Sequence, residues 1–452
     1  MTMKFRNYIL SATVSLSLAS CQKFLEVQPK ESVSDEQTIF DVTSATEAVR
    51  GIYNAFANGS YYGTSFQSIG YLSGDNVQWT GSQSQVQEFI NHNVRSDNST
   101  ISAAWGQIYV AINRANNVID KVPTLQDPHF SEDNKNQLLG EAYFLRALAY
   151  FDLVRTWGGV PLILKPTLTA TDNSGVARST KQETYAQVLN DLNKAEALLP
   201  ASTNRYRATA KTVWALKSRY YLYQGDWAKA ESYATKVISD VTNYQLKSPY
   251  NSFFANGARG TVESVFEIYY NGTTETNGHG GQWLPQTLGG TRQWAPNDAF
   301  VALANNATIG GNRSALVAKD NQNRWYGTLY PSTTSSASYV IRIAELFLIR
   351  AEARAQQNLL TGASGALFDL NAVRARAGLD ASTATTQADV LLAIENERRV
   401  EFAFEPHRWF DLVRTNRAAA VLGVTDTTKY ILPLPSQQVL LDPALKQNPG
   451  YN

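Results

Sequence analysis

The chain has 452 residues, which is enough for a large hydrophobic core and, by length alone, for two or three domains. Its 43% hydrophobic and 17% charged residues are ordinary for a globular protein, and its formal net charge is +1. A balanced charge provides no chain-wide attraction to nucleic acid or to an anionic membrane surface, so we expect no nucleic-acid partner. Aromatic residues are plentiful, with 9 Trp, 23 Tyr and 18 Phe, and core packing is the first explanation for any single ring.

The first twenty residues have the pattern of a secretory signal. Lys4 and Arg6 form a basic start, and residues 8–18 are apolar or small but too few to span a bilayer. The sequence Leu-Ala-Ser-Cys then ends at Cys21, the single cysteine of the chain, and resembles a bacterial lipobox. The alternative is an ordinary signal peptide with a chance cysteine. We expect a signal peptide over 1–20, lipidation at Cys21, and a polar tether over 21–37 that leaves the protein anchored by acyl chains.

Helical periodicity predicts a mostly α body, and we expect residues 38–452 to form a single domain. Apolar residues recur at helical spacing in several segments, and Pro or Gly follows several of them. The predicted helices are 43–57, 103–122, 132–157, 182–199, 208–223 and 227–240.

The clearest helix pair lies near the C-terminal end. Residues 339–356 have a stripe of Ile343, Leu346 and Phe347, and a second helix begins at Ala366, with two arginines in its last turn and Gly378 just beyond. Two helices joined by a short loop bury too little surface to be stable alone. The pair therefore requires neighbouring helices.

A weak internal repeat links three of the predicted helices. An aromatic, a basic and a small residue recur with one spacing at 143–147, 214–218 and 347–351. The second copy follows the tetratricopeptide spacing, although Lys217 stands where that pattern has Leu. The copies are unevenly spaced, so we expect no regular solenoid. We predict a tetratricopeptide-like scaffold of stacked helix pairs over about 43–57, 103–245 and 339–414.

Two segments, about 58–102 and 246–338, have a different composition. They are rich in Gly, Ser, Asn and Thr or Gln, with scattered Tyr and Trp, and include a strand-like run at 261–270. Long loops in a compact domain are usually functional. We expect these segments to form a loop-rich ligand face with a few short strands.

Enzymatic sequence motifs are missing from the chain. It has no HExxH, GxSxG, Walker loop or GxGxxG sequence. Its four histidines, at 92, 129, 279 and 407, are far apart, so we expect no metal site and no cofactor. Two carboxylates that meet only in space, as in a glycoside hydrolase, are an alternative, but 39 acidic residues provide many chance candidates. We expect a protein that is not an enzyme.

The densest charged run, residues 395–414, interleaves acidic, basic and aromatic residues. A catalytic interpretation would use one of its carboxylates or His407. A structural interpretation, which we favour, pairs its arginines with its carboxylates around a buried aromatic turn and adds Asp411 with Arg414. The other residues concerned are Glu397, Glu401, Glu405, Arg398, Arg399 and Arg408.

Several segments resemble the SusD/RagB family of surface glycan-binding lipoproteins. The run ERRVEFAFEPHRWFDLVR at 397–414 is similar to the family signature of two Arg, Glu, then Glu-Gly-x-Arg and Asp-Leu, with Pro406 in place of the usual Gly. Further similar segments occur in the family's order along nearly the whole chain. They are the lipobox at Cys21, FLEVQPK at 24–30, FLRALAYFDLVRTWGGVPLI at 144–163, VESVFEIYY at 262–270, RIAELFLIRAEA at 342–353 and QNPGY at 447–451.

The resemblance implies a mostly α, tetratricopeptide-like fold with an irregular ligand face and a role without catalysis. Members of the family sit on the outer face of the outer membrane, capture oligosaccharide or peptide, and deliver it to a SusC-like TonB-dependent transporter. The resemblance therefore implies a lipid-anchored protein on the extracellular side, with an oligosaccharide ligand and a transporter partner. The alternatives are peptide capture within the same family, a surface glycoside hydrolase, and a helical-repeat adaptor that binds only protein.

Exposed aromatic residues on polar loops are the candidates for sugar contact. A sugar ring stacks its apolar face on a flat aromatic side chain, while polar side chains bond its hydroxyl groups. Trp79 follows Asp75 and Asn76 in a loop that resembles the one carrying a stacking Trp in starch-binding members of the family. Packing beneath a loop is the competing explanation for each ring. The predicted contacts are Tyr61, Asp75, Asn76, Trp79, Trp283, Trp294, Trp325 and Tyr326.

Overall fold

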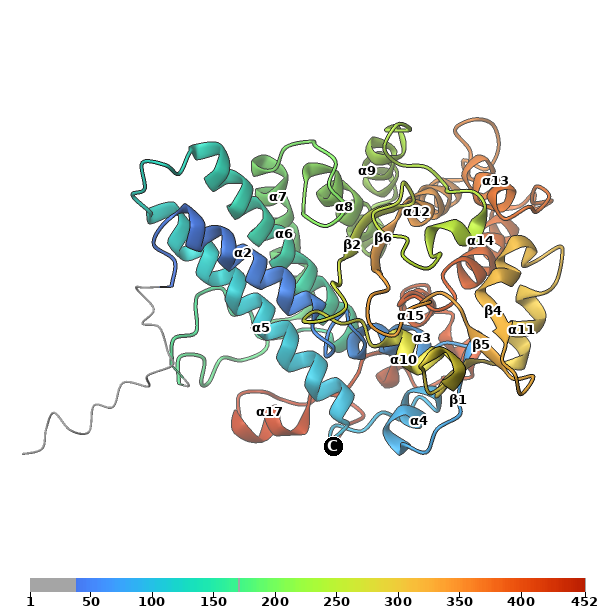
Figure 1. The fold of residues 1–452 in the computed structure, drawn as a ribbon, viewed down its shortest axis with the longest axis horizontal. Helices are drawn as coiled ribbons and strands as arrows, with labels where there is room; N and C mark the ends of the chain where they lie inside the picture. The colour runs from blue at the N-terminus through green and yellow to red at the C-terminus, as the bar shows by residue number, and fades with distance from the viewer. Residues whose placement is uncertain (1–37, 170, 452) are drawn as a thin grey trace, which may run out of the picture. The chain divides into compact units, whose positions relative to one another are not determined.

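A computed structural model describes residues 38–169 and 171–451, so the signal peptide, Cys21 and tether predicted for residues 1–37 lie outside the described residues. Asp41–Asn452 pack as one unit in which helices predominate (Figure 1). The helices are α2 (Val42–Ala57), α3 (Ser65–Leu72), α4 (Ser84–Ile90), α5 (Ser99–Lys121), α6 (Glu132–Trp157), α7 (Lys181–Leu198), α8 (Ala210–Gln224), α9 (Trp227–Ile238), α10 (His279–Trp283), α11 (Asp298–Ala304), α12 (Ile343–Gln356), α13 (Ala366–Arg376), α14 (Gln387–Glu401), α15 (Arg408–Arg414), α16 (Ala418–Leu422) and α17 (Ser436–Leu441). The predicted mostly α fold is confirmed.

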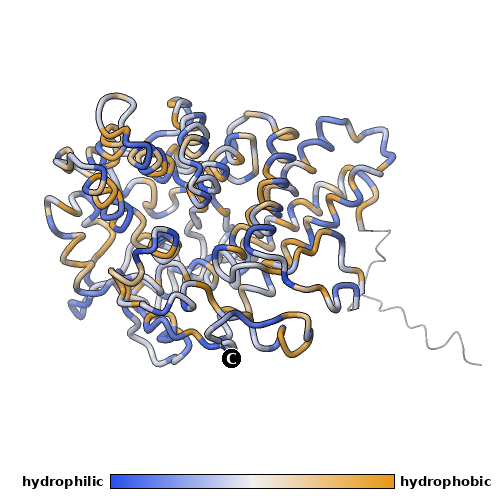
Figure 2. Tube along the Cα trace, turned by 180° about the vertical axis from the view of Figure 1, so that it is seen from behind, coloured by the Kyte–Doolittle hydropathy of each residue, from blue (hydrophilic) through white to orange (hydrophobic). Residues whose placement is uncertain are grey.

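The long helices pack on one another in chain order. α2 lies against α5, α5 against α6, α6 against α7, and α8 against both α7 and α9. α9 then packs on α12, which also contacts α13 and α14. Hydrophobic and hydrophilic residues alternate along these helices (Figure 2), as expected of helices with one buried side. None of the helices described is both long and apolar enough to cross a bilayer.

Small residues line the contact between α12 and α13. Ala351 and Ala355 on α12 are fully buried in a cluster with Leu370 and Val373 on α13. α13 carries two arginines in its last turn, as predicted, and Gly378 follows with a φ of 73°. This left-handed conformation favours glycine and turns the chain away from the helix.

The basic residue of the weak repeat joins neighbouring helices. Arg146 on α6 donates to both carboxylate oxygens of Asp191 on α7, at 2.8 Å each. Arg350 on α12 binds Asp369 on α13 in the same way, at 2.8 and 2.7 Å. Lys217 on α8 forms its ion pair with Glu196 on α7. The repeat therefore has a physical role, which is one ion pair between adjacent helices.

The strands form three antiparallel pairs. They are β1 (Val77–Trp79) with β3 (Trp294–Pro296), β2 (Ser264–Ile268) with β6 (Ser338–Arg342), and β4 (Val317–Lys319) with β5 (Trp325–Gly327). The strand expected within 261–270 is confirmed as β2.

The prediction of a helix from residue 339 is wrong in its first turn. Ser338–Arg342 forms β6, and α12 begins only at Ile343. Val340 and Ile341 are β-branched and lie in a strand that is buried throughout and pairs with β2. Such residues pack well in a sheet and have less preference for a helix, so pairing with β2 makes this segment a strand instead of a helical turn.

A buried network of ion pairs joins β6 to distant parts of the chain. The guanidinium group of Arg342 donates to Glu263 at 2.8 Å, to Glu401 at 2.8 Å and to Glu405 at 2.6 Å. Every side chain in the network is at most 3% exposed. Its members, which we call the Arg342 network, are Glu263, Arg313, Arg342, Arg376, Glu397, Glu401 and Glu405.

The charged run at 395–414 is structural, but its predicted partners are wrong. Glu397, Glu401 and Glu405 were expected to pair with arginines of the run, but they pair with arginines outside it, as Glu401 does with Arg313 and Arg342. Burial alone would raise the pKa of Glu401, but the facing guanidinium groups outweigh burial and lower this pKa to about 2. The run's own Arg398 instead binds Asp411 at 2.7 Å, and Asp411 also binds Arg414 at 2.9 Å as predicted.

Replacing Arg342 by Met should lower the free energy of unfolding by about 3–5 kcal/mol, because Glu405 would stay buried without a cation, and Glu263 and Glu401 would each lose one of theirs. Chemical denaturation measures the change. Arg95→Met is the matched control, since Arg95 pairs with Asp97 on the surface, where both side chains are more than half exposed. This control should change stability by less than about 1 kcal/mol. An equally small effect of both substitutions would contradict the role given to the Arg342 network.

Candidate functional site

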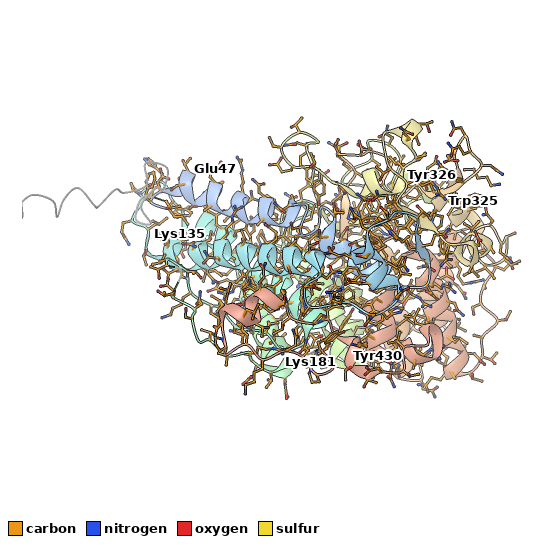
Figure 3. All side chains as sticks on the ribbon, turned by 90° about the horizontal axis from the view of Figure 1, so that it is seen from below. Glu47, Lys135, Lys181, Trp325, Tyr326 and Tyr430 are labelled. Atoms are coloured by element: carbon orange, nitrogen blue, oxygen red, sulfur yellow. The ribbon has the colours of Figure 1, made fainter. Side chains whose placement is uncertain are left out.

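Short strands bring partly exposed aromatic residues from both loop-rich segments to one place. β1 pairs with β3 so that Trp79 is opposite Trp294, and β5 lies beside β3. Trp325 and Tyr326 are on β5, and Figure 3 shows them together at the margin of the structure. We define the β1–β3–β5 surface by its residues Trp79, Arg292, Trp325 and Tyr326, all of which are partly exposed.

Arg292 ties the segment before β3 to both neighbouring strands. Its Nε donates to the carbonyl oxygen of Trp325 at 2.8 Å, and its own carbonyl accepts from the hydroxyl of Thr80 at 2.6 Å. Its φ of 49° is uncommon for a residue with a side chain and stores backbone strain. Burial, with the nearby cation of Arg324, lowers the pKa of Arg292 from its ordinary value. No motif in the sequence singled out this residue.

The two indole rings of the surface are held in place but not enclosed. A Cβ atom at residue 81 would lie 2.3 Å from Cζ2 of Trp79, so only Gly81 allows the chain to fold against this ring. The Nζ of Lys319 lies 4.9 Å from the centroid of a Trp325 ring. Both tryptophans are partly exposed, which makes their rings candidates for stacking with a flat ligand.

Three of the predicted contact rings lie in the interior instead. Tyr61 is 0%, Trp283 1% and Trp294 5% exposed. Trp283 packs against Phe404 with ring centroids 4.4 Å apart, and Gly327 of β5 approaches it closely from above. The expectation that these three rings are exposed is therefore wrong. The polar loops around them fold over them, because burying a large ring is more favourable than leaving it in water.

Asp75 and Asn76 are also committed to internal bonds. Asp75 accepts from Nε of Arg408 at 2.7 Å, and Asn76 accepts from Nε of Arg399 at 2.9 Å while donating to its carbonyl at 3.0 Å. Burial would raise the pKa of Asp75, but the two arginines outweigh burial and lower it. Both side chains, which are predicted ligand contacts, thus have partners within the protein. They fix the loop that carries Trp79 to the charged run.

A buried aromatic cluster supports the surface from below. The Tyr71 ring lies 5.7 Å from Trp283 and 5.5 Å from Trp294, centroid to centroid. His279 stacks on Tyr330 at 4.5 Å, and its Nδ1 is 2.8 Å from the Tyr71 hydroxyl. Burial lowers the pKa of His279 to about 3, so the ring is neutral at pH 7. The surface therefore rests on a rigid, uncharged floor.

Two family models match the chain in order. One, described as starch-binding and associating with the outer membrane, matches residues 23–222, and the model of the SusD family matches residues 305–451. Together they match well over half of the chain. The chain belongs to the SusD family.

Known proteins agree with this assignment. A SusD-like protein of Formosa agariphila is 28% identical over 521 residues, covering 99% of this chain and 100% of the relative. The starch-binding protein SusD of Bacteroides thetaiotaomicron is 30% identical over 156 residues, covering 32% of this chain and 27% of that protein. A SusD superfamily crystal structure from Bacteroides vulgatus has a TM-score of 0.80 at 25% identity, covering 92% of this chain and 100% of that one. A laminarin-binding SusD-like protein has a TM-score of 0.79 at 23% identity, covering 91% and 100%, and shares the fold.

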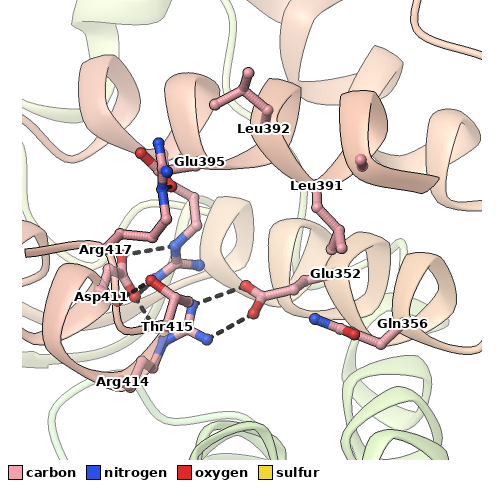
Figure 4. Close-up of a pocket in the computed structure, with 11 residues that line it drawn as sticks. Glu352, Gln356, Leu391, Leu392, Glu395, Asp411, Arg414, Thr415 and Arg417 are labelled. Carbon is pink, nitrogen blue, oxygen red and sulfur yellow. Dashed lines mark hydrogen bonds and ion pairs between the residues drawn. The ribbon is translucent and has the colours of Figure 1, made fainter. Parts of the chain in front are cut away.

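One cavity of this SusD-family protein, of about 380 Å³, lies between α12, α14 and α15 and contains three carboxylates (Figure 4). Each carboxylate is paired with an arginine across the cavity. The pairs are Glu352 with Arg414 at 2.6 Å, Glu395 with Arg417 at 2.8 Å, and Asp411 with Arg398 at 2.7 Å. Burial would raise the pKa of Asp411, but the guanidinium groups of Arg398 and Arg414 outweigh burial and lower this pKa, whereas the general acid of a glycoside hydrolase needs a raised pKa. The arrangement suits ion pairing rather than proton transfer. Within 38–169 and 171–451, no group of three or more His, Cys, Asp or Glu is placed to hold a metal ion.

His279→Phe should reduce the loss of stability in mild acid. In the unfolded chain His279 binds a proton below its ordinary pKa of 6.5, whereas in the folded protein it stays neutral down to about pH 3. The contribution of neutral His279 to the free energy of unfolding is therefore complete above pH 6.5 and decreases as the pH falls below that value. When the pH is lowered from 8 to 5, the free energy of unfolding of the variant should fall by about 2 kcal/mol less than that of the wild type. Chemical denaturation at the two pH values measures this difference.

Tyr71→Phe is the control for His279→Phe, because it breaks the same hydrogen bond but keeps the imidazole. It should be less stable at both pH values and keep the wild-type pH dependence. If His279→Phe also keeps the wild-type pH dependence, the imidazole is not held neutral by burial.

Proposed function

We propose that this SusD-family protein captures an oligosaccharide on the β1–β3–β5 surface, leaves it uncleaved, and delivers it to a SusC-like TonB-dependent transporter. The observation that carries the proposal is that β3 lies beside both β1, which carries Trp79, and β5, which carries Trp325 and Tyr326. Partly exposed rings from segments far apart in the chain therefore stand on strands that share one neighbour. Membership of a family of carbohydrate-binding proteins associated with the outer membrane supports it.

The surface has the two chemistries that sugar recognition requires. Partly exposed rings offer flat faces to the apolar side of a pyranose. Polar side chains stand beside them, with Arg292 between β3 and β5 and the partly exposed Gln78 and Gln293 on or next to the paired strands. Because the rings sit on a buried aromatic floor, little conformational freedom would be lost on binding.

Localisation and partner belong to the same proposal. We infer that the protein is anchored through lipid on Cys21 and faces the extracellular side of the outer membrane, since the lipobox pattern directly precedes that cysteine. Starch and laminarin are named for a relative and for a structural neighbour, respectively, so they are the first probes to use.

The double variant Trp79→Ala/Trp325→Ala should bind the glycan at least about tenfold more weakly, because each lost ring removes on the order of 1 kcal/mol of stacking. Native gels containing soluble starch or laminarin identify the glycan that retards the wild type, and calorimetry measures its affinity. Trp227→Ala, at a partly exposed ring on α9 of the helical scaffold, is the matched control and should bind like the wild type.

Three results would contradict the proposal. Wild-type affinity in a correctly folded double variant would remove this surface as the site. Shortened oligosaccharide after incubation would show an enzyme rather than a binding protein. Retention of peptides in place of either glycan would favour peptide capture.

A further inference from the structure

Two exposed tyrosines form a pair outside the β1–β3–β5 surface. Tyr206, in the segment before α8, is 36% exposed, and Tyr269, directly after β2, is 46% exposed. Their ring centroids are 5.6 Å apart and their planes meet at 76°, so the two rings have an edge-to-face arrangement. Neither tyrosine was among the contacts expected from the sequence.

The local structure holds both rings in this position. The Glu267 N–H donates to the Arg205 carbonyl at 2.9 Å, which fixes the Tyr206 segment beside β2. The Tyr206 hydroxyl lies where a side chain at residue 260 would be, because a Cβ added to Gly260 would come within 2.5 Å of it. Arg259 lies 5.2 Å from the centroid of Tyr269. The two exposed tyrosine rings are therefore held in place by contacts with neighbouring residues.

The tyrosines border a cavity of about 350 Å³, which falls in the size range of small-ligand sites. α2 and the segment after β2 complete its walls. We call it the α2–β2 pocket, lined by Arg50, Tyr53, Asn54, Tyr206, Tyr269 and Glu275.

The rim of the α2–β2 pocket offers both donors and acceptors. Asn54 on α2 is exposed and carries an amide that can donate and accept. Glu275 is an acceptor held by the hydroxyl of Thr274 at 2.9 Å, and Arg50 is a donor held by Glu47 at 2.8 Å. One acid and one base leave the rim without net charge. Aromatic walls and a mixed, neutral rim match a pyranose ring with several hydroxyl groups and no charge.

We propose that the α2–β2 pocket is a second saccharide site, which binds a neutral pyranose unit of the same glycan chain that occupies the β1–β3–β5 surface. The inference rests on the proposed function, since it takes a glycan as the ligand. Figure 3 labels Glu47 on α2, Trp325 and Tyr326 all in the upper half of the view. A long glycan that contacts both places binds the second one intramolecularly, which raises its affinity above that of a short one.

The double variant Tyr206→Ala/Tyr269→Ala tests the pocket. The probes are soluble starch and laminarin in native gels, followed by calorimetry with the polysaccharide that binds and with its disaccharide, maltose or laminaribiose. The affinity for the polysaccharide should fall at least tenfold, and by a larger factor than the affinity for the disaccharide. Phe368→Ala is the matched control, because Phe368 is a 54% exposed ring on α13, and it should bind like the wild type. Circular dichroism should show the same fold for all three proteins.

The two double variants separate this inference from the proposed function. Wild-type affinity for the polysaccharide in Tyr206→Ala/Tyr269→Ala, with loss in Trp79→Ala/Trp325→Ala, would overturn the pocket and leave the β1–β3–β5 surface standing. Weaker binding by Tyr206→Ala/Tyr269→Ala, with wild-type affinity in Trp79→Ala/Trp325→Ala, would support the pocket and exclude the β1–β3–β5 surface as a site. Failure of the wild type to bind either polysaccharide would overturn both.

Discussion

The fold depends on the burial of Arg342 among three carboxylates. Taking these charges out of water is costly, and the cost is offset only when every bond in the set is made. The carboxylates come from the start of β2, the end of α14 and the turn after it, so the network brings together parts of the chain more than 100 residues apart. It therefore joins the helical scaffold to the loop-rich segments, and the position of one limits the position of the other.

The candidate surface is built outward from this centre in two steps. The charged run that supplies Glu401 to the Arg342 network also supplies Arg408, which holds Asp75 in the loop before Trp79. Next to it, Trp283 and its aromatic neighbours form the floor under β5. Packed helices thus form the scaffold, while short strands carry the partly exposed rings.

Local patterns in the sequence predicted the helices, because helical periodicity and end residues act over a few positions, as at α6 and α13. The switch from strand to helix at Ile343 was missed, since only the partner strand β2 makes it favourable. The exposure of aromatic residues was predicted poorly for the same reason. Trp79 and Trp283 both occur in polar, glycine-containing stretches of the sequence, yet Trp79 is partly exposed and Trp283 is buried against Phe404 and Gly327. The ion-pair partners of the charged run could not be predicted either, because Glu401 pairs with Arg313 and Arg342, which are far from it in the sequence.

A crystal structure of the protein with a bound oligosaccharide from the glycan that it retains would test the central claim most directly. The account predicts an intact sugar chain with a ring stacked on Trp79 or Trp325. It also predicts that β1, β3 and β5 keep the positions they have without ligand. Sugar found only on the helical scaffold, or a cleaved product, would contradict it.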